Sequence, residues 1–201
     1  AQFLAMSLPP KNHEMTDLIV EESKRIVALL DQVEQFGDIT PPNCAEVNIH
    51  DVLDQAARSA TFGFAGDIQI SKNYDPSLPN VWADADQMVQ VFLNLIKNAC
   101  EALGDKGEIS LRTFYDPNLR FVLPDSHGQR LPLHVDITDN GPGLLEALAK
   151  HVFDPFVSSK SNGKGLGLAL VSKIVTQHNA WVSVVSRPGK TTFKISLPIK
   201  V

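Results

Sequence analysis

The segment Leu133-His-Val-Asp-Ile-Thr-Asp-Asn-Gly-Pro-Gly143 alternates in polarity and then breaks at a Gly-Pro-Gly run, which predicts a strand that ends in a tight loop. Such a strand brings Asp139 to the mouth of a sheet, and Gly141 and Gly143 let the backbone approach a ligand closely. A carboxylate there can accept a hydrogen bond from an amine such as N6–H of adenine. The same residues also form a good tight turn without any ligand, so the segment alone leaves both interpretations open.

A helix predicted over residues 84–103 carries a second set of polar residues. Its apolar stripe, which should face the core, consists of Met88, Phe92, Leu95 and Ala99. Asn94, Asn98 and Glu101 gather on one polar edge beside that stripe. Asparagine disfavours a helix interior, so two of them a turn apart suggest a function. An amide oxygen is a hard, neutral ligand that suits Mg²⁺, although two solvated polar residues are the alternative interpretation.

A third segment, Gly163-Lys-Gly-Leu-Gly-Leu168, runs into a helix predicted over residues 165–179. Glycines ahead of a helix start leave N–H donors and the positive end of the helix dipole for a phosphate chain. The spacing matches neither a P-loop nor a dinucleotide-binding fingerprint. Lys160 and Lys164 can add charge against phosphates, with solvated loop lysines as the alternative. Upstream, Phe153-Asp-Pro-Phe156 suggests aromatic anchors for one end of a mobile lid.

The remaining pattern predicts a mixed sheet with helices. Strands are expected at 47–49, 68–71, 81–83, 108–115, 119–123, 131–138, 181–186 and 191–197, and helices at 51–60, 84–103 and 165–179. The turn-rich stretch 124–129 indicates a hairpin between the strands that flank it. We therefore expect a two-layer α/β sandwich in which helices cover one face of the sheet.

Composition excludes several classes of protein. The 201 residues are 43% hydrophobic and 20% charged, which is typical of a globular domain with an appendage. A net charge of −5 argues against a nucleic-acid binder, because phosphates require a basic face. We find no apolar run long enough for a bilayer and no signal peptide, and expect a cytoplasmic fragment of a longer protein. Cys44 and Cys100 make no disulfide framework, and Cys100 is expected to be a buried thiol.

Residues 11–36 form a long predicted helix with one apolar face. The apolar residues recur at three- and four-residue steps and are Met15, Leu18, Ile19, Ile26, Leu29, Leu30 and Val33. This face either packs on its own domain or pairs with another helix in a bundle. Gly37 ends the helix, and residues 39–45 are typical of a linker.

Taken in order, the four motifs resemble the N, G1, F and G2 boxes of the histidine-kinase ATPase domain, over roughly residues 46–201. The motifs are Asn94-x-x-x-Asn98-Ala99, Asp139-x-Gly141-x-Gly143, Phe153-Asp154-Pro155-Phe156 and Gly163-x-Gly165-x-Gly167. The longer phrases Asn94-Leu-Ile-Lys-Asn-Ala-Cys-Glu-Ala-Leu103 and Phe153-Asp-Pro-Phe-Val-Ser-Ser-Lys160 are most similar to sensor kinases of the nitrogen-regulation (NtrB) type. The resemblance implies transfer of the γ-phosphoryl group of ATP to a histidine, and thence to an aspartate of a response regulator.

The resemblance also implies a role for each matching residue. It places Asn98 on Mg²⁺, Asn94 near the phosphates and Asp139 on adenine, with Thr191 near that carboxylate. The implied nucleotide-binding set is Asn94, Asn98, Glu101, Asp139, Gly141, Gly143, Phe156, Lys160, Gly163, Lys164, Gly165, Leu166, Gly167, Leu168 and Thr191. In ATPases of the wider superfamily a carboxylate at the position of Asn94 activates water. An amide is no base at neutral pH, so this site should hold ATP without rapid hydrolysis.

By the same resemblance, residues 1–38 are a remnant of a dimerisation and phosphotransfer helical hairpin, 39–45 a linker and 46–201 the catalytic domain. The hairpin should carry a His followed by an acidic residue and Asn-Pro. His13-Glu14 is the one similar pair, but it stands at the start of the second helix, so we expect the phosphoacceptor to lie outside these residues. The implied partners are a second copy through residues 11–36, an NtrC-type response regulator and a PII-type signalling protein, with no nucleic acid and no membrane.

Other functional classes stay open at this point. An ATPase of the gyrase or chaperone type would need the acidic residue that Asn94 replaces. A switch kinase of an anti-sigma system would normally lack the long helix at residues 11–36. A binding module that keeps the fold without chemistry would be revealed by a nucleotide-binding assay.

Overall fold

The computed structural model describes residues 17–23, 40–104, 106–117, 120–121, 129–158 and 165–199. The chain divides into two compact units, Ala1–Thr40 and Pro41–Val201. In the first unit, the described residues 17–23 are helical, and Leu18 and Ile19 are 61% and 54% exposed. The rest of the helix predicted over residues 11–36 lies outside the described residues.

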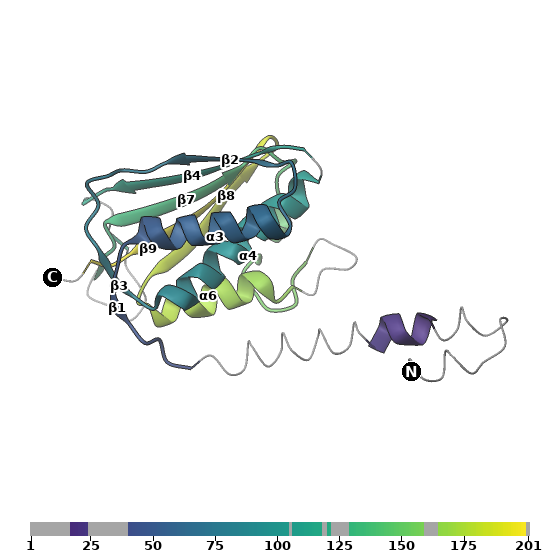
Figure 1. Ribbon diagram of the computed structural model, residues 1–201, viewed down its shortest axis with the longest axis horizontal. Helices are drawn as coiled ribbons and strands as arrows, with labels where there is room; N and C mark the ends of the chain where they lie inside the picture. The colour runs from purple at the N-terminus through teal and green to yellow at the C-terminus, as the bar shows by residue number, and fades with distance from the viewer. Residues whose placement is uncertain are drawn as a thin grey trace. The chain divides into compact units, whose positions relative to one another are not determined.

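A five-stranded mixed sheet forms one layer of the second unit (Figure 1). In spatial order its strands are β2 (Gln69–Asn73), β4 (Glu108–Tyr115), β7 (Leu133–Asp139), β9 (Lys190–Leu197) and β8 (Trp181–Arg187). The β2–β4 pair is parallel, and the other three pairs are antiparallel. Two short pairs complete the strands, β1 (Ala45–Val47) with β3 (Val81–Ala83) and β5 (Arg120–Phe121) with β6 (Gln129–Arg130).

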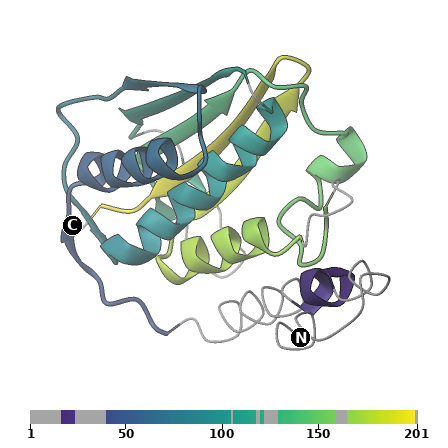
Figure 2. The same ribbon diagram turned by 45° about the vertical axis from the view of Figure 1, so that its right-hand side comes forward.

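Three helices form the second layer on one face of the sheet, as the two views in Figures 1 and 2 show. They are α3 (Ile49–Gly63), α4 (Ala85–Leu103) and α6 (Gly167–Gln177), while the short α5 (Glu146–Ala149) lies in the connection between β7 and α6. Strands with one buried face alternate in polarity, and β4 follows this rule. Its Ile109 and Leu111 are buried, whereas Glu108 and Arg112 are exposed. The two-layer α/β sandwich predicted from the sequence is therefore confirmed.

Helix α4 lies centrally, between α3 and α6, and supplies much of the core. Its buried residues are Met88, Val89, Val91, Phe92, Leu95, Ile96, Ala99 and Cys100. Asp84 caps its start by accepting a hydrogen bond from the Gln87 backbone N–H, and Gly104 ends it with a φ of 70°. Burial raises the pKa of the Cys100 thiol, and the prediction of a buried, unpaired cysteine is confirmed.

A buried histidine ties the end of α6 to the start of α4. His178 donates from Nδ1 to the Ile174 carbonyl at 2.8 Å, so its Nε2 is free to accept from the Asp84 N–H at 3.0 Å. The Asp84 N–H would otherwise be one of the orphan donors at a helix start. The contact fixes the spacing between the two helices that carry the N and G2 motifs.

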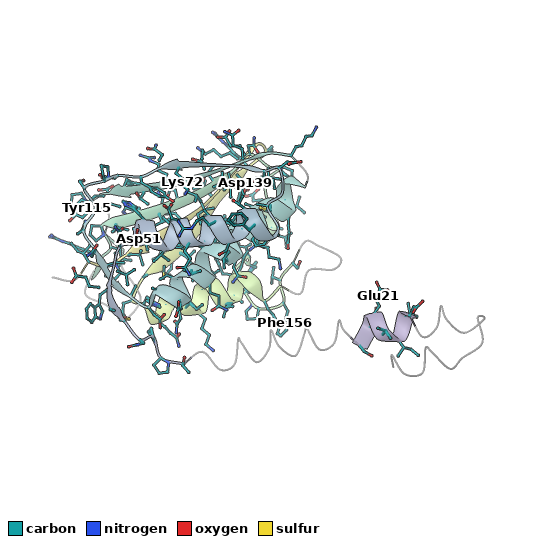
Figure 3. The ribbon with its side chains drawn as sticks, in the orientation of Figure 1. Glu21, Asp51, Lys72, Tyr115, Asp139 and Phe156 are labelled. Atoms are coloured by element: carbon teal, nitrogen blue, oxygen red, sulfur yellow. The ribbon has the colours of Figure 1, made fainter. Side chains whose placement is uncertain are left out.

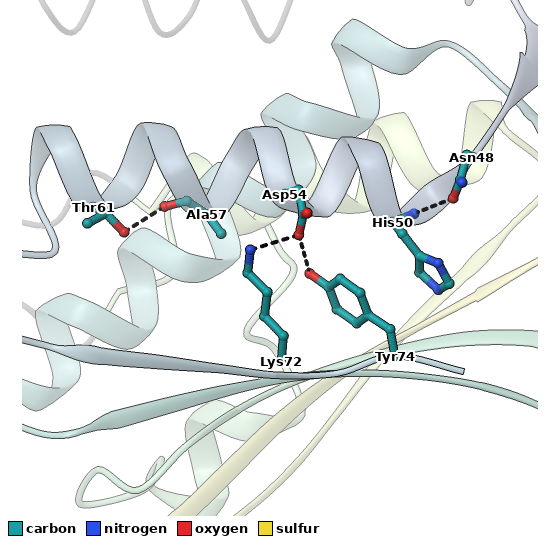
Figure 4. A network of polar contacts seen from close by, with 7 residues as sticks. All are labelled: Asn48, His50, Asp54, Ala57, Thr61, Lys72 and Tyr74. Atoms are coloured by element: carbon teal, nitrogen blue, oxygen red, sulfur yellow. Dashed lines mark hydrogen bonds and ion pairs between the residues drawn. The ribbon is translucent and has the colours of Figure 1, made fainter. Parts of the chain in front are cut away.

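A polar network holds α3 against the edge strand β2 (Figure 4). Asp54 pairs with Lys72 at 2.9 Å and accepts a hydrogen bond from the Tyr74 hydroxyl at 3.1 Å, while His50 stacks on Tyr74 at 4.8 Å. Burial acts to raise the pKa of Asp54, but the bonds from Lys72 and Tyr74 lower it overall. Burial and then the Asp54 charge raise the pKa of Tyr74 above its ordinary value of 10.0. The network therefore holds an ionised carboxylate and a neutral phenol together.

Some predicted boundaries were wrong. Residue Ile49, predicted as the end of a strand, begins α3, because Asn48 caps the helix by accepting from the His50 N–H. The hairpin predicted around residues 124–129 pairs β5 with β6, whereas Leu133–Asp139 lies between β4 and β9. Long strands with complementary buried faces outcompete the local hairpin for the position next to β4. No helix in the part of the chain that the structure describes combines the length and apolar character needed to cross a membrane.

Candidate functional site

Asp139 stands at the end of β7 (Figure 3). Its register partners are Ile109 of β4 on one side and Thr191 of β9 on the other. Its side chain is 3% exposed, and Oδ1 accepts a hydrogen bond from the Gly141 N–H at 2.9 Å. Burial raises the pKa of Asp139, and the Gly141 N–H partly offsets this. With Oδ1 held by the loop, the carboxylate can use Oδ2 to accept from a ligand.

Gly141 has no room for a side chain. A Cβ at this position would lie 2.8 Å from Asp139 Oδ1 and 3.6 Å from the Cβ of Ala102 in α4. The loop therefore passes close to both the carboxylate and the last turn of α4. This close approach is the reason that glycine is required here.

Gly143 packs against the turn between β8 and β9. It has a φ of 89°, and a Cβ here would lie 2.8 Å from the carbonyl carbon and oxygen of Arg187. In the same contact, the Gly189 N–H donates to the Gly141 carbonyl at 2.9 Å. The loop after β7 is thus held between α4 and the β8–β9 turn.

One stripe of α4 connects this loop to the start of α6. Asn94, Asn98 and Ala102 follow each other at four-residue steps, which places them on one side of the helix. Because a helix rises about 1.5 Å per residue, Asn94 and Ala102 lie about 12 Å apart along its axis. Ala102 borders Gly141, and a Cβ on Gly167 would lie 3.2 Å from Asn94 Oδ1. The two half-buried asparagines therefore line the path between the G1 and G2 motifs.

Asn94 is oriented by its own helix. Its Nδ2 donates to the Gln90 carbonyl at 2.9 Å, which leaves Oδ1 as the end that faces Gly167. Glu101, predicted on the same polar edge, is exposed. Within the described residues no group of three or more His, Cys, Asp or Glu side chains is placed to hold a metal. The prediction that the Asn98 amide oxygen binds Mg²⁺ stays a prediction.

The two ends of the F-to-G2 segment meet at Gly165. Gly165 has a φ of 66°, and a Cβ on it would lie 2.5 Å from the carbonyl carbon of Phe156. The Phe156 N–H donates a hydrogen bond to the Gly165 carbonyl at 3.0 Å. Phe153 packs edge-to-face on Phe193 at 6.3 Å, but Phe156 is 71% exposed (Figure 3). Of the two predicted aromatic anchors, Phe153 therefore contacts the core, whereas the Phe156 side chain is exposed.

The other predicted G2 residues divide into two groups. Leu166 is buried, and Gly167 and Leu168 are half-buried at the start of α6. Lys160, Gly163 and Lys164 lie outside the described residues, so their predicted contacts with phosphate stay predictions.

Ser186 is a further residue beside this site that was not predicted from the sequence. Its Oγ accepts a hydrogen bond from the Leu144 N–H at 2.8 Å and lies 2.9 Å from Oγ1 of Thr191. It thus joins the loop after β7 to the predicted adenine-side threonine. The only signal in the sequence is the two-residue alternation of β8 and β9, which becomes informative once their register is known.

Comparison with known proteins gives a family and several relatives. The model of the "Histidine kinase-, DNA gyrase B-, and HSP90-like ATPase" family matches residues 83–201. The chain is 58% identical over 199 residues to the sensory histidine kinase/phosphatase NtrB of Rhodobacter capsulatus, covering 99% of this chain and 56% of the relative. It is 48% identical over 201 residues to the sensory histidine kinase/phosphatase NtrB of Rhizobium meliloti, covering 98% of this chain and 53% of the relative. The chain thus spans about half the length of these relatives.

Solved structures share the fold at low identity. The mycobacterial sensor histidine kinase MprB superposes with a TM-score of 0.63 at 24% identity, covering 77% of this chain and 97% of that one. Histidine kinase ThkA, in its complex with the response regulator protein TrrA, gives a TM-score of 0.70 at 20% identity, covering 96% and 53%. The family match extends over more than half of the chain and includes the Asp139 loop, the α4 asparagines and the start of α6, so the chain belongs to the histidine kinase-, DNA gyrase B- and HSP90-like ATPase family.

Proposed function

We propose that this chain is the ATP-binding catalytic part of a sensor histidine kinase that acts in nitrogen regulation. The observation that carries the proposal is the stripe of α4 that connects the loop beside the buried Asp139 carboxylate to the glycine-rich start of α6. The similarity to the NtrB of Rhodobacter capsulatus, at 58% identity over nearly the whole chain, supports the kinase class and the regulatory context. Residues 1–38 then represent a remnant of the dimerisation hairpin, followed by a linker at 39–45.

The adenine base fits the Asp139 end of the stripe. When it is ionised, the Asp139 carboxylate can only accept hydrogen bonds, and its Oδ1 already accepts one from the Gly141 N–H. An amine such as N6–H of adenine would donate a hydrogen bond to the remaining oxygen, Oδ2. Because the surroundings exclude water, this contact contributes more selectivity than it would at the surface.

The triphosphate fits the opposite end. The start of α6 directs backbone N–H groups and the positive end of the helix dipole toward the space beside Asn94. Asn98 would hold Mg²⁺ through its amide oxygen, and the ion supplies neutralisation of the phosphate charge. Glu101, Lys160 and Lys164 are further proposed contacts along the same path.

The residue at position 94 distinguishes phosphoryl transfer from rapid hydrolysis. Asn94 cannot remove a proton from water at neutral pH, and its Oδ1 faces Gly167. The chain should therefore hold ATP with its γ-phosphoryl group positioned for an incoming histidine. That histidine is proposed to lie outside these residues, and the phosphoryl group would pass from it to an NtrC-type response regulator. We place this activity in the cytoplasm, with a second copy bound through residues 11–36 and a PII-type protein as regulator.

Calorimetric binding of ATP and ADP, with and without Mg²⁺, tests the nucleotide site. Asp139→Asn should weaken binding at least tenfold, because the amide replaces an acceptor-only group with a donor. The matched control is Asp136→Asn, on the same strand but on the helix-free face, which should bind as the wild type does. Asn98→Ala should remove the Mg²⁺ dependence. Absence of wild-type binding at millimolar ATP would refute the proposal.

The kinase step needs a second assay. Mixed with a separately produced NtrB dimerisation hairpin, the chain should transfer label from γ-labelled ATP to the hairpin histidine, and alone it should remain unlabelled. The alternative function, an ATPase or nucleotide-binding interaction module of the same superfamily, predicts phosphate release without histidine labelling, or binding without either product.

A further inference from the structure

Ser186, Thr191 and Asp139 lie side by side across three adjacent strands. Ser186 of β8 is the register partner of Thr191 of β9, and Thr191 is the register partner of Asp139 of β7. Thr191 and Asp139 are 4% and 3% exposed. A fourth group, the Leu144 N–H, donates to Ser186 Oγ at 2.8 Å. The loop after β7 and the carboxylate are therefore connected through two hydroxyl groups.

Either hydroxyl of the Ser186–Thr191 pair can be the donor, and one of the two directions leaves a proton for a ligand. A hydroxyl has one proton to donate and can accept twice. Ser186 is half-buried and accepts from the Leu144 N–H, which leaves its own proton to be donated to a neighbouring acceptor. Thr191 Oγ1, at 2.9 Å, is the acceptor within reach. When Ser186 donates to Thr191, the Thr191 proton is left to be donated toward a ligand.

A Thr191 hydroxyl that donates toward the ligand complements the hydrogen-bonding edge of adenine but not that of inosine or guanine. Adenine presents a donor, N6–H, beside an acceptor, N1, and inosine or guanine presents O6 beside N1–H. With Asp139 as acceptor and Thr191 as donor, the site pairs with N6–H and N1 of adenine. In inosine and guanine the donor and acceptor are exchanged, so both contacts would be mismatched. If Thr191 donated to Ser186 instead, two acceptors would face the base and this discrimination would be lost.

We propose that Ser186 is a positioning residue that selects adenine, because it holds the Thr191 hydroxyl as a donor beside Asp139. The inference rests on the proposed binding of ATP at Asp139. It adds a residue of β8, outside the four sequence motifs, to the determinants of base specificity. Ser186 is held in place by the Leu144 backbone, so the loop and the specificity element are coupled.

Calorimetry with ATP and with inosine triphosphate tests this role. Ser186→Ala should weaken ATP binding about tenfold, as expected for the loss of a half-buried hydrogen bond worth about 1.4 kcal/mol, and change inosine triphosphate binding less than about twofold. The ratio of the two affinities should therefore fall close to tenfold. Ser186→Thr, which keeps the hydroxyl, should retain the wild-type ratio. Ser186→Cys keeps the side-chain volume with a weak donor and should reproduce the loss if the alanine variant does not fold.

Two comparisons separate positioning from simple support of the loop. Ser183→Ala removes a hydroxyl from the opposite face of the same strand and should leave both affinities unchanged. In a Thr191→Val background, Ser186→Ala should cause no further change in the ratio. Equal losses for both nucleotides, or an unchanged ratio, would overturn the role of Ser186 alone. A wild-type chain that binds neither nucleotide would overturn the proposed function, and this inference with it.

Discussion

An alanine at Gly143 would meet the backbone of β8, whereas an alanine at Gly189 would meet nothing. The two glycines have φ angles of 89° and 82°, so a side chain at either carries the same left-handed strain. A Cβ on Gly143 would lie 2.8 Å from the Arg187 carbonyl carbon and oxygen, and Gly189 has no atom within 4 Å of that position. The pair therefore isolates the effect of close packing from that of backbone conformation.

The expected magnitudes follow from this geometry. Left-handed backbone costs an alanine roughly 1–2 kcal/mol, which is the full expected loss for Gly189→Ala. For Gly143→Ala, overlap with atoms that cannot rotate away adds roughly 1–3 kcal/mol. The difference between the variants should appear in the free energy of unfolding of the Pro41–Val201 unit, which contains both tryptophans, Trp82 and Trp181.

Urea unfolding followed by tryptophan fluorescence provides the assay, with the wild type and both variants compared at one temperature. Gly143→Ala should lower the transition midpoint clearly more than Gly189→Ala does, with similar slopes. Gly143→Ala should also weaken ATP binding, because displacement of the loop moves the Leu144 N–H away from Ser186. Equal destabilisation by the two substitutions would refute the reasoning from close approach.

Three further perturbations test separate contacts. Because burial raises the pKa of Asp139, its ionisation opposes folding, and the stability gained from the protonated form is lost as the pH rises through the raised pKa. Asp139→Asn should therefore stabilise the unit in thermal unfolding at neutral pH, and it should weaken ATP binding. The ATP affinity of the wild type should fall toward that of the variant as the pH drops through this pKa. His178→Ala should destabilise the unit by about 1–3 kcal/mol in urea, since it leaves the Asp84 N–H unpaired; a loss below about 0.5 kcal/mol would contradict the helix-linking role. In an alkaline absorbance titration, one of the two tyrosines should ionise above the usual range, and Tyr74→Phe should abolish that delayed step. Ionisation of both tyrosines together would contradict the bond from Tyr74 to Asp54.

Local signals in the sequence were sufficient for the principal elements. The predicted strand over residues 108–115 matches β4 at both ends, and the helix predicted from Asp84 to Leu103 differs from α4 by its capping residue. Both are defined by nearby residues, through alternation in the strand and through Asp84 and Gly104 at the helix ends. The order of the motifs was also sufficient to indicate the family.

Contacts between distant residues were beyond these signals. The sequence carries no local mark that β9 inserts between β7 and β8, yet this order is what brings Thr191 beside Asp139 and Ser186 beside Thr191. The outward position of Phe156 depends in the same way on its contact with Gly165, nine residues further along the chain.

The sequence by itself predicted candidate side chains for the chemistry and placed the principal helices and strands that hold them, because periodicity, caps and turn residues act over a few positions. Only the tertiary structure decided which of those side chains meet. Strand register is selected by the burial of whole faces, and one stripe of α4 reaches Gly141 and Gly167 only after the helix has packed on the sheet. The site is therefore assembled by long-range packing from parts that the local sequence specifies.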